Sequence, residues 1–309
     1  MLVALLTAAL FLRLVRLDTV PPGMTHDEAA FGAEAEQILS GERPLYFALG
    51  YGHEPLYAYA VALAFRLLGH TLTAMRVTSA IFGLLAVLFS YLVARRLLPG
   101  WAPWLAAATM AVAFWPVSLS RQALRAITLV ATWLPAAWLF LRGVSRRADG
   151  GYGNPPYNAK PAAWSPRQFL PFALGGALLG LSIYTYMASR VTWLVFPLWA
   201  LVLLLHKSTR RLLARIWPGL VVLLLVAALV ALPLVRYLRA HPEAERRVGD
   251  MMEPIEELLQ GKPQRVLKHT WNALRVFSWE GDRFPVYNVP GRPVFGFFAS
   301  ALFDLGLAA

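Results

Sequence analysis

The chain has 309 residues, of which 58% are hydrophobic and only 15% are charged. Soluble domains carry charge on roughly a quarter of their residues, so this composition excludes an ordinary soluble protein and indicates a polytopic membrane protein. The net charge of +12 does not indicate nucleic-acid binding, because Arg and Lys cluster in short segments between apolar runs, as in membrane topology. The absence of cysteine excludes disulfides and thiolate metal sites.

About eight apolar runs are candidate membrane spans, because about 20 apolar residues are needed to cross about 30 Å of hydrocarbon. In chain order they are residues 1–14, 77–97, 101–117, 124–141, 169–186, 191–205, 218–235 and 294–309. Residues 56–68 are also apolar, but a helix of this length reaches only about 20 Å. We therefore expect the segment 56–68 to lie at the membrane interface.

Basic residues set the expected orientation. If 56–68 does not cross, the basic clusters at 95–96, 142–167 and 207–215 all lie on one side, which the positive-inside rule makes cytoplasmic. Residues 18–76 and 236–293 then form two long outer loops. The sequence thus predicts an all-α, multi-pass protein of the cell membrane whose first outer loop carries short interfacial helices.

The first outer loop contains an acidic pair, Asp27 and Glu28, in the polar segment PPGMTHDE. Thr25 followed by Glu28 predicts a capping box at the start of a helix, and Gly41 supplies a C-terminal stop. Capping accounts for Glu28, which could also contact a substrate, but not for Asp27. Asp27 is therefore the candidate general base, because a carboxylate there faces the outer aqueous phase.

A second short helix is expected to begin at Pro55 and to end near Gly69. His53 and Glu54 then lie at its N-terminus, where backbone N–H groups and the helix dipole favour anionic ligands. Two such helices, each with a carboxylate at its start, could form the floor of a substrate site. The alternative is that they only anchor the loop in the interface.

Three arginines are expected on the same outer side. Arg121 and Arg125 lie in SRQALRA, and Arg190 lies in YTYMASR between two spans. Charged residues near membrane segments are costly and usually have partners or face an aqueous cavity. Because a guanidinium binds phosphate through paired hydrogen bonds, these arginines are candidates for binding a lipid-linked phosphate. The alternative is snorkelling to lipid headgroups.

The second outer loop ends in WEGDRFPVYNVPGRP, whose aromatic, Gly and Pro content predicts a turn-rich lid. Asp282 and Asn288 could contact a polar substrate, although Asp282 could equally hold a turn. No Gly-rich phosphate loop and no HExxH motif occurs, so no metal site is predicted. A site built from His and Glu remains open, and a divalent cation could assist.

The motifs RLDTVPPGMTHDEAAFGAEAEQIL, GHEPLYAY, SRQALRA, YTYMASR and GDRFPVYNVPGRP, in this order, resemble bacterial membrane glycosyltransferases related to the protein O-mannosyltransferases and the lipid A aminoarabinose transferases. The resemblance implies the C-type glycosyltransferase (GT-C) fold. It implies transfer of a hexose or pentose from a polyprenyl-phosphate carrier to a protein, lipid or polysaccharide on the extracytoplasmic face.

The same resemblance implies residue roles. Asp27 matches the catalytic carboxylate, Glu54 matches a second active-site carboxylate, and Arg125 and Arg190 are the candidates for binding the carrier phosphate. The additional outer-loop elements of the protein mannosyltransferases have no counterpart that we can locate in this chain, which leaves the acceptor open. The expected domain spans residues 1–309, and we expect it to be part of a longer protein because Ala309 lies inside an apolar run.

Two rival functions share several of these features. A non-catalytic transporter or flippase-like protein for lipid-linked sugars would have the same spans and arginines, but no need for Asp27. It would be expected to show repeated halves, and no clear repeat is seen. A structural subunit of an envelope assembly is the other rival. Neither explains why acidic residues stand at the start of both short helices.

Overall fold

The computed structural model describes residues 1–49, 51–148, 164–285 and 288–308, and these are helical apart from turns and one isolated bridge between Phe47 and His53. The helices up to residue 148 are α1 (Leu2–Leu14), α2 (His26–Leu39), α3 (Leu56–Leu68), α4 (Leu72–Leu97), α5 (Ala102–Val112), α6 (Phe114–Arg121) and α7 (Ala126–Ala148). Those that follow are α8 (Pro166–Ser182), α9 (Ser189–Thr192), α10 (Val195–Leu205), α11 (Arg210–Ala240), the 3-10 turn η1 (Pro242–Ala244), α12 (Arg246–Leu259), α13 (Gln264–Ser278) and α14 (Phe297–Ala308). The expected all-α architecture is confirmed.

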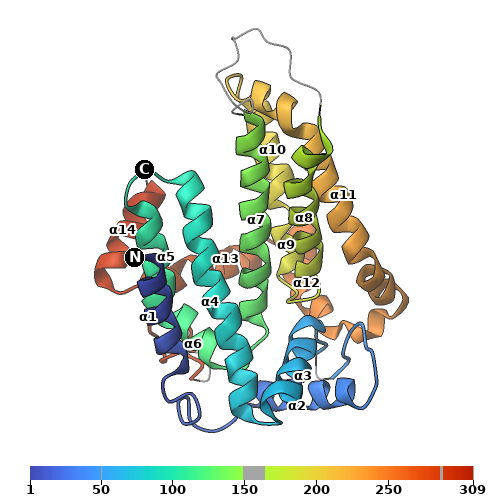
Figure 1. Cartoon of the computed structure of the whole chain (residues 1–309), viewed down its shortest axis with the longest axis vertical. Helices are drawn as coiled ribbons and strands as arrows, with labels where there is room; N and C mark the ends of the chain where they lie inside the picture. The colour runs from blue at the N-terminus through green and yellow to red at the C-terminus, as the bar shows by residue number, and fades with distance from the viewer. Residues whose placement is uncertain (50, 149–163, 286–287, 309) are drawn as a thin grey trace.

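The helices pack in two groups that meet along α4 and α7 (Figure 1). α1, α5 and α6 pack against α4, with Ala9, Val87 and Ala111 in the core between them. α8, α10 and α11 form the second group with α7, around Phe172 and Leu223. α2 and α3 lie together across one end of α4. The bundle is therefore closed at one end by the short helices that carry the candidate site residues.

Three described helices are long and apolar enough to cross a membrane, namely α4, α7 and α11. α5 and α6 together qualify as a fourth span, bent by 48°. The break falls at Ala113, because Pro116 has no N–H for the Val112 carbonyl and its ring would clash there. The other expected spans are shorter helices, so the described residues hold three or four full-length spans where the apolar runs predict about eight.

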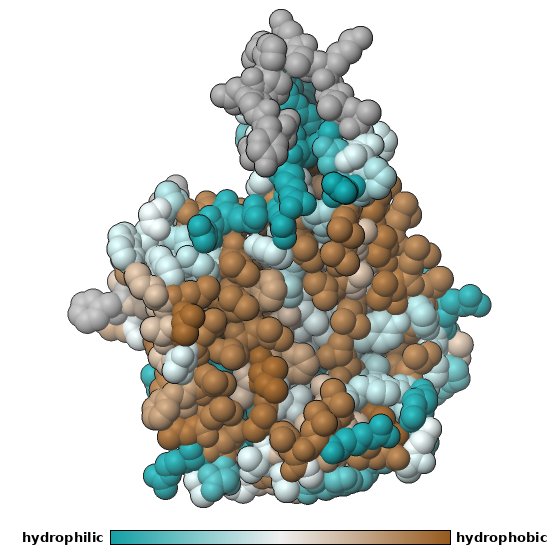
Figure 2. All heavy atoms as spheres, viewed as in Figure 1, coloured by the Kyte–Doolittle hydropathy of each residue, from teal (hydrophilic) through white to brown (hydrophobic). Residues whose placement is uncertain are grey.

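On the face shown in Figure 2, apolar side chains cover much of the middle of the molecule, with hydrophilic patches above and below them. Helix α11 contributes to this apolar surface. Apolar side chains that are 42% to 65% exposed recur every three or four residues along its outward face: Trp217, Val221, Leu225, Leu229 and Leu232. A continuous exposed apolar stripe of this length is unfavourable in water and suits contact with lipid. The surface thus agrees with a membrane protein.

Small residues let α8 approach α11 closely. A Cβ built at Gly180 would lie 2.6 Å from the Ala227 carbonyl oxygen, and one at Gly176 would collide with the Leu223 carbonyl. The two glycines are four residues apart on one face of α8, the spacing that allows close backbone contact between membrane helices. This contact fixes α8 and therefore the loop that follows it toward Tyr186.

Both expected short helices are present. α2 begins after Thr25 with the predicted capping box, and α3 spans Leu56–Leu68 between Pro55 and Gly69. The expected outer loop 236–293 is largely helical instead, because α11 continues to Ala240 and is followed by the amphipathic helices α12 and α13. Its polar composition reflects exposed helix faces rather than irregular structure.

We expect Gly176→Ala to destabilise the protein by about 1–3 kcal/mol, because the added methyl group must displace the α11 backbone. Gly306→Ala is the matched control, since a Cβ there meets no described atom within 4 Å. The check is the thermal unfolding midpoint of each purified variant in the same detergent. Equal midpoints for the two variants would contradict the close contact of α8 with α11.

Candidate active site

Glu28 is an internal anchor. Its side chain is fully buried, and Oε1 accepts hydrogen bonds from Arg76 Nε (2.9 Å) and the Ala123 backbone N–H (3.0 Å). Oε2 accepts from the Thr25 backbone N–H at 2.9 Å. Burial raises the pKa of Glu28, but Arg76 and the two N–H donors outweigh it and hold the pKa below the usual 4.5. Both carboxylate oxygens of Glu28 thus have partners inside the protein, as its capping role requires, and a contact of Glu28 with substrate stays a prediction.

The Asp27 side chain points in a different direction from that of Glu28, because neighbouring residues of an α-helix are rotated by about 100° about the helix axis. It is partly exposed and lines a cavity of about 450 Å³. The other residues that line this cavity are Phe31, His53, Trp115, Leu119, Leu124, Arg125, Ala126, Tyr186 and Asp282. The fold therefore brings four of the expected site residues, Asp27, His53, Arg125 and Asp282, to one cavity from separate segments. We call it the Asp27 cavity.

Arg125 is held in the cavity wall by Glu54. Its Nη1 lies 2.5 Å from Glu54 Oε2, and its guanidinium stacks on Tyr186 at 5.4 Å from the ring centroid. Nη2 also donates to the Gly52 carbonyl at 3.4 Å. Glu54 itself is 1% exposed and does not line the cavity. The structure therefore places Glu54 behind Arg125 as its ion-pair partner, and direct binding of substrate by Glu54 stays a prediction.

Arg190 lies behind this pair rather than in the Asp27 cavity. Its Nη2 is 3.6 Å from Glu54 Oε1 and pairs closely with Glu245. Burial, aided by the Glu54 and Glu245 carboxylates, raises the pKa of the adjoining Tyr46 to about 12. The two arginines and two glutamates balance in charge. In this conformation Arg190 belongs to the ion-pair network with Glu54 and Glu245, and its binding of a carrier phosphate stays a prediction.

The Arg121 guanidinium forms hydrogen bonds with backbone carbonyl groups. It donates to the carbonyls of Leu12 and Val15 at 2.7 Å and to that of Val20 at 2.9 Å, which satisfies the C-terminal end of α1 and the following turn. It is absent from the Asp27 cavity. Because α6 ends at Arg121 and the chain turns at Gln122, Arg121 is separated from Arg125 and lines the second cavity described below. Its binding of a lipid-linked phosphate stays a prediction.

Glu34 is a partner of His53 that the sequence patterns do not single out. His53 Nδ1 lies 2.6 Å from Oε1 of Glu34, which is 2% exposed, and the His53 backbone is fixed by its bridge with Phe47. Within the described residues, no hydrogen bond engages His53 Nε2. Glu34 follows Asp27 by seven residues, two helical turns along the same face of α2. That spacing is the signal that could have identified it.

Asp282 and Asn288 have different roles. Asn288 is 4% exposed, and its Nδ2 donates to the carbonyls of Asp282 and Arg292, both at 2.8 Å. Asn288 therefore holds the loop together. Asp282 accepts from the Phe284 backbone N–H at 2.9 Å, which forms a turn, and it also lines the Asp27 cavity. The turn expected at Asp282 is present, and a contact of Asp282 with a polar substrate stays a prediction.

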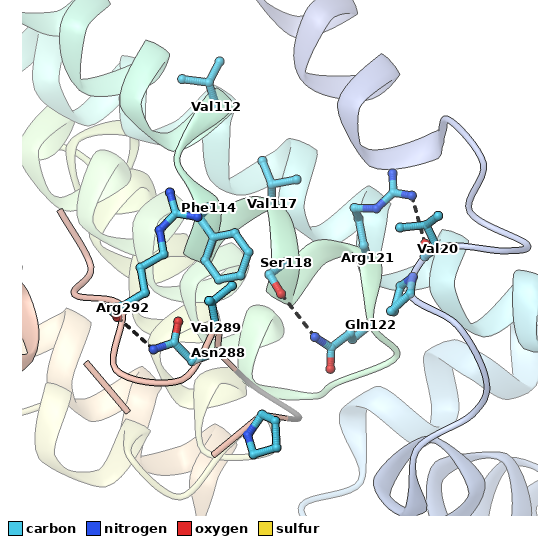
Figure 3. Close-up of a pocket in the computed structure, with 12 residues that line it drawn as sticks. Val20, Val112, Phe114, Val117, Ser118, Arg121, Gln122, Asn288, Val289 and Arg292 are labelled. Atoms are coloured by element: carbon cyan, nitrogen blue, oxygen red, sulfur yellow. Dashed lines mark hydrogen bonds between the residues drawn. The ribbon is translucent and has the colours of Figure 1, made fainter. Parts of the chain in front are cut away.

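A second cavity, of about 540 Å³, lies on the other side of this loop (Figure 3). It is lined by Val20, Pro21, Val112, Phe114, Val117, Ser118, Arg121, Gln122, Pro285, Asn288, Val289 and Arg292. The Arg292 guanidinium stacks on Phe114 at 4.8 Å. Apolar walls beside a cation suit an amphiphilic molecule. No group of three or more possible metal ligands occurs among the described residues.

We expect Glu28→Gln to destabilise the protein by about 3–5 kcal/mol, because Arg76, 1% exposed, would remain buried without its counter-charge. Asp27→Asn makes the same chemical change one residue earlier and should keep the wild-type thermal unfolding midpoint.

The stability that Glu28 contributes should also depend on pH. Because the folded-state pKa of Glu28 is lowered, its contribution to the free energy of unfolding is complete above about pH 4.5 and is lost as the pH falls through the folded-state value. Glu28→Gln should therefore flatten the acid limb of stability against pH. Equal losses in both variants would contradict the anchoring role.

Residues 52–153, about a third of the chain, match the family model described as dolichyl-phosphate-mannose-protein mannosyltransferase. Among solved structures, the chain is similar to the oligosaccharyltransferase of Archaeoglobus fulgidus tethered with an acceptor peptide that contains the NVT sequon, with a TM-score of 0.53 and 17% identity. The similarity covers 84% of this chain and 37% of that one, so the chain spans little more than a third of its length. A comparison with curated proteins finds no match.

The matched residues, 52–153, include His53, Glu54 and Arg125, the arginine that faces the Asp27 cavity. At 17% identity, the structural similarity concerns the fold alone. The expected resemblance is confirmed: the chain has a GT-C fold, and residues 52–153 match a mannosyltransferase family model.

Proposed function

We propose that the chain is the membrane domain of a glycosyltransferase that moves a hexose or pentose from a polyprenyl-phosphate carrier to an acceptor on the extracytoplasmic face. The observation that carries this proposal is that Asp27 and Arg125 line one cavity. A carboxylate and a guanidinium there are the two groups that this reaction needs, a base for the acceptor and a cation for the leaving phosphate.

In the proposed reaction, Asp27 takes the proton of the acceptor hydroxyl as its oxygen attacks the anomeric carbon. The bond between that carbon and the phosphate oxygen breaks, and the electron pair leaves with the carrier phosphate. Arg125 stabilises the charge that develops there. Because the leaving group is already a phosphate, no general acid is required. Attack opposite the leaving group inverts the anomeric configuration.

His53 and Glu34 support this chemistry. The Glu34 carboxylate, 2.6 Å from Nδ1, fixes the tautomer in which Nδ1 carries the proton. His53 Nε2 is then a hydrogen-bond acceptor in the wall of the cavity. It is placed to accept a hydrogen bond from a hydroxyl of the sugar or of the acceptor, and so to orient the reacting groups.

The proposed membrane side follows from the two ends of α4. Arg76 and the α2–α3 pair lie near its start, whereas Arg95 and Arg96 lie in its last turn. Under the positive-inside rule the basic end is cytoplasmic, so the Asp27 cavity opens on the other face. Lipid-linked sugar donors then reach it from the membrane. The acceptor remains one of protein, lipid or polysaccharide.

We expect Asp27→Asn to lower sugar transfer by roughly 10²–10⁴-fold, the usual contribution of a general base. The assay uses purified wild-type and variant protein with labelled polyprenyl-phosphate mannose and a membrane extract as the acceptor source. Asp18→Asn, an exposed carboxylate outside both cavities, is the matched control and should keep full activity. Normal transfer by Asp27→Asn would rule out the mechanism and favour a non-catalytic lipid-sugar carrier.

The proposed roles of Arg125 and His53 can be distinguished by measuring kcat and the KM for the lipid-linked donor in variants of each residue. Arg125→Gln should both lower kcat and raise KM for the lipid-linked donor, because it removes the cation that binds the phosphate and stabilises its developing charge. Glu34→Gln and His53→Asn should lower only kcat, by roughly 10-fold or more, with donor KM little changed. Steady-state rates over a range of donor concentrations distinguish these outcomes. A donor KM that rises equally in all three variants would contradict the separate roles.

A further inference from the structure

A third cavity lies far from the proposed active site, at the opposite end of α4. It has a volume of about 340 Å³ and is lined by Leu92, Arg95, Arg96 and Trp138. Leu92, Arg95 and Arg96 belong to the last turns of α4, and Trp138 faces them from α7. None of these residues takes part in the proposed reaction, so the role of this cavity is a separate question.

The aromatic wall of this cavity is held between cations. The Trp138 ring packs edge-on against Phe89 at 5.9 Å, and the guanidinium groups of Arg142 and Arg96 lie 5.3 and 5.9 Å from its centroid. Arg96 also donates to Ser145 Oγ at 3.3 Å. Stacking and hydrogen bonding therefore fix the two guanidinium groups around Trp138.

The charge of this cluster is not neutralised by the described part of the chain. Arg95, Arg142 and Arg146 each lie within electrostatic reach of Arg96. Among the described residues, no carboxylate lies within 4.0 Å of any of them. Four like charges held at one place repel one another, and an anion bound between them relieves that repulsion.

The position of the cluster indicates where the anion comes from. The arginines follow the apolar run of α4, and hydrophilic side chains gather where the upper ends of α4 and α7 meet the apolar surface (Figures 1 and 2). This is the depth of lipid headgroups at a membrane surface. Leu92 and Trp138 add an apolar wall suited to the glycerol and first acyl carbons.

We propose that this cavity binds the phosphate headgroup of an anionic phospholipid. The phosphodiester lies between Arg95 and Arg96, which bind it through paired N–H groups, and the lipid backbone packs on Trp138. The bound lipid neutralises the cluster and ties α4 to α7 at the end remote from the Asp27 cavity. This site is independent of the proposed sugar transfer.

The test is lipid binding by the whole purified chain, delipidated in detergent and measured by native mass spectrometry. Dioleoyl-phosphatidylglycerol is the probe, and dioleoyl-phosphatidylcholine and inorganic phosphate are the comparison ligands. We expect preferential retention of phosphatidylglycerol. The double variant Arg95→Gln/Arg96→Gln should bind it roughly 10- to 30-fold more weakly, because about 1 kcal/mol is lost per arginine near an anionic headgroup.

Two controls make the result specific. The first control is the double variant Arg236→Gln/Arg239→Gln, which removes the same amount of charge from exposed positions in the last turns of α11, outside the arginine cluster. This variant should bind the lipid normally. Arg95→Lys/Arg96→Lys keeps the charge, folds without a buried mismatch and should bind with intermediate affinity. The proposal is overturned if both glutamine pairs weaken binding equally, if phosphatidylcholine binds as well, or if millimolar inorganic phosphate displaces the lipid completely.

Discussion

The ion pair between Arg76 and Glu28 is the constraint on which the site depends. Both side chains are almost fully buried, so neither can ionise at low cost without the other. Glu28 also accepts the Ala123 backbone N–H, which locks α2 to α4 and to the connection between α6 and α7 at once. With Glu28 turned inward, the helical rotation directs Asp27 to a different side, and that side is the cavity.

A second buried pair sets the opposite wall. Glu54 holds Arg125 against Tyr186, while Arg190 and Glu245 complete a balanced network behind it. Desolvated charges of this kind cost stability unless they are well paired, and they concentrate at functional sites. The two pairs together place an acid and a guanidinium in one cavity, although the residues concerned come from widely separated parts of the chain.

Local signals in the sequence predicted the short helices well, because Thr25, Pro55 and Gly69 act on their own neighbours through caps and fixed dihedral angles. Long-range partners were not predictable in this way. Arg121 and Arg125 share a helical spacing, yet the turn at Gln122 sends one to α1 and the other to the cavity. Glu34 went unrecognised because its partner His53 lies beyond a turn. Several of the eight apolar runs form helices of fewer than 18 residues, a length that apolar composition alone does not reveal.

The central claim is that one cavity holds a base and a phosphate-binding arginine for a lipid-linked sugar. A cryo-electron microscopy structure of the protein with polyprenyl-phosphate mannose tests it most directly. The account predicts density for the phosphate within hydrogen-bonding distance of Arg125, with the anomeric carbon facing Asp27. Phosphate density beside Arg292 in the second cavity, with the Asp27 cavity empty, would contradict it.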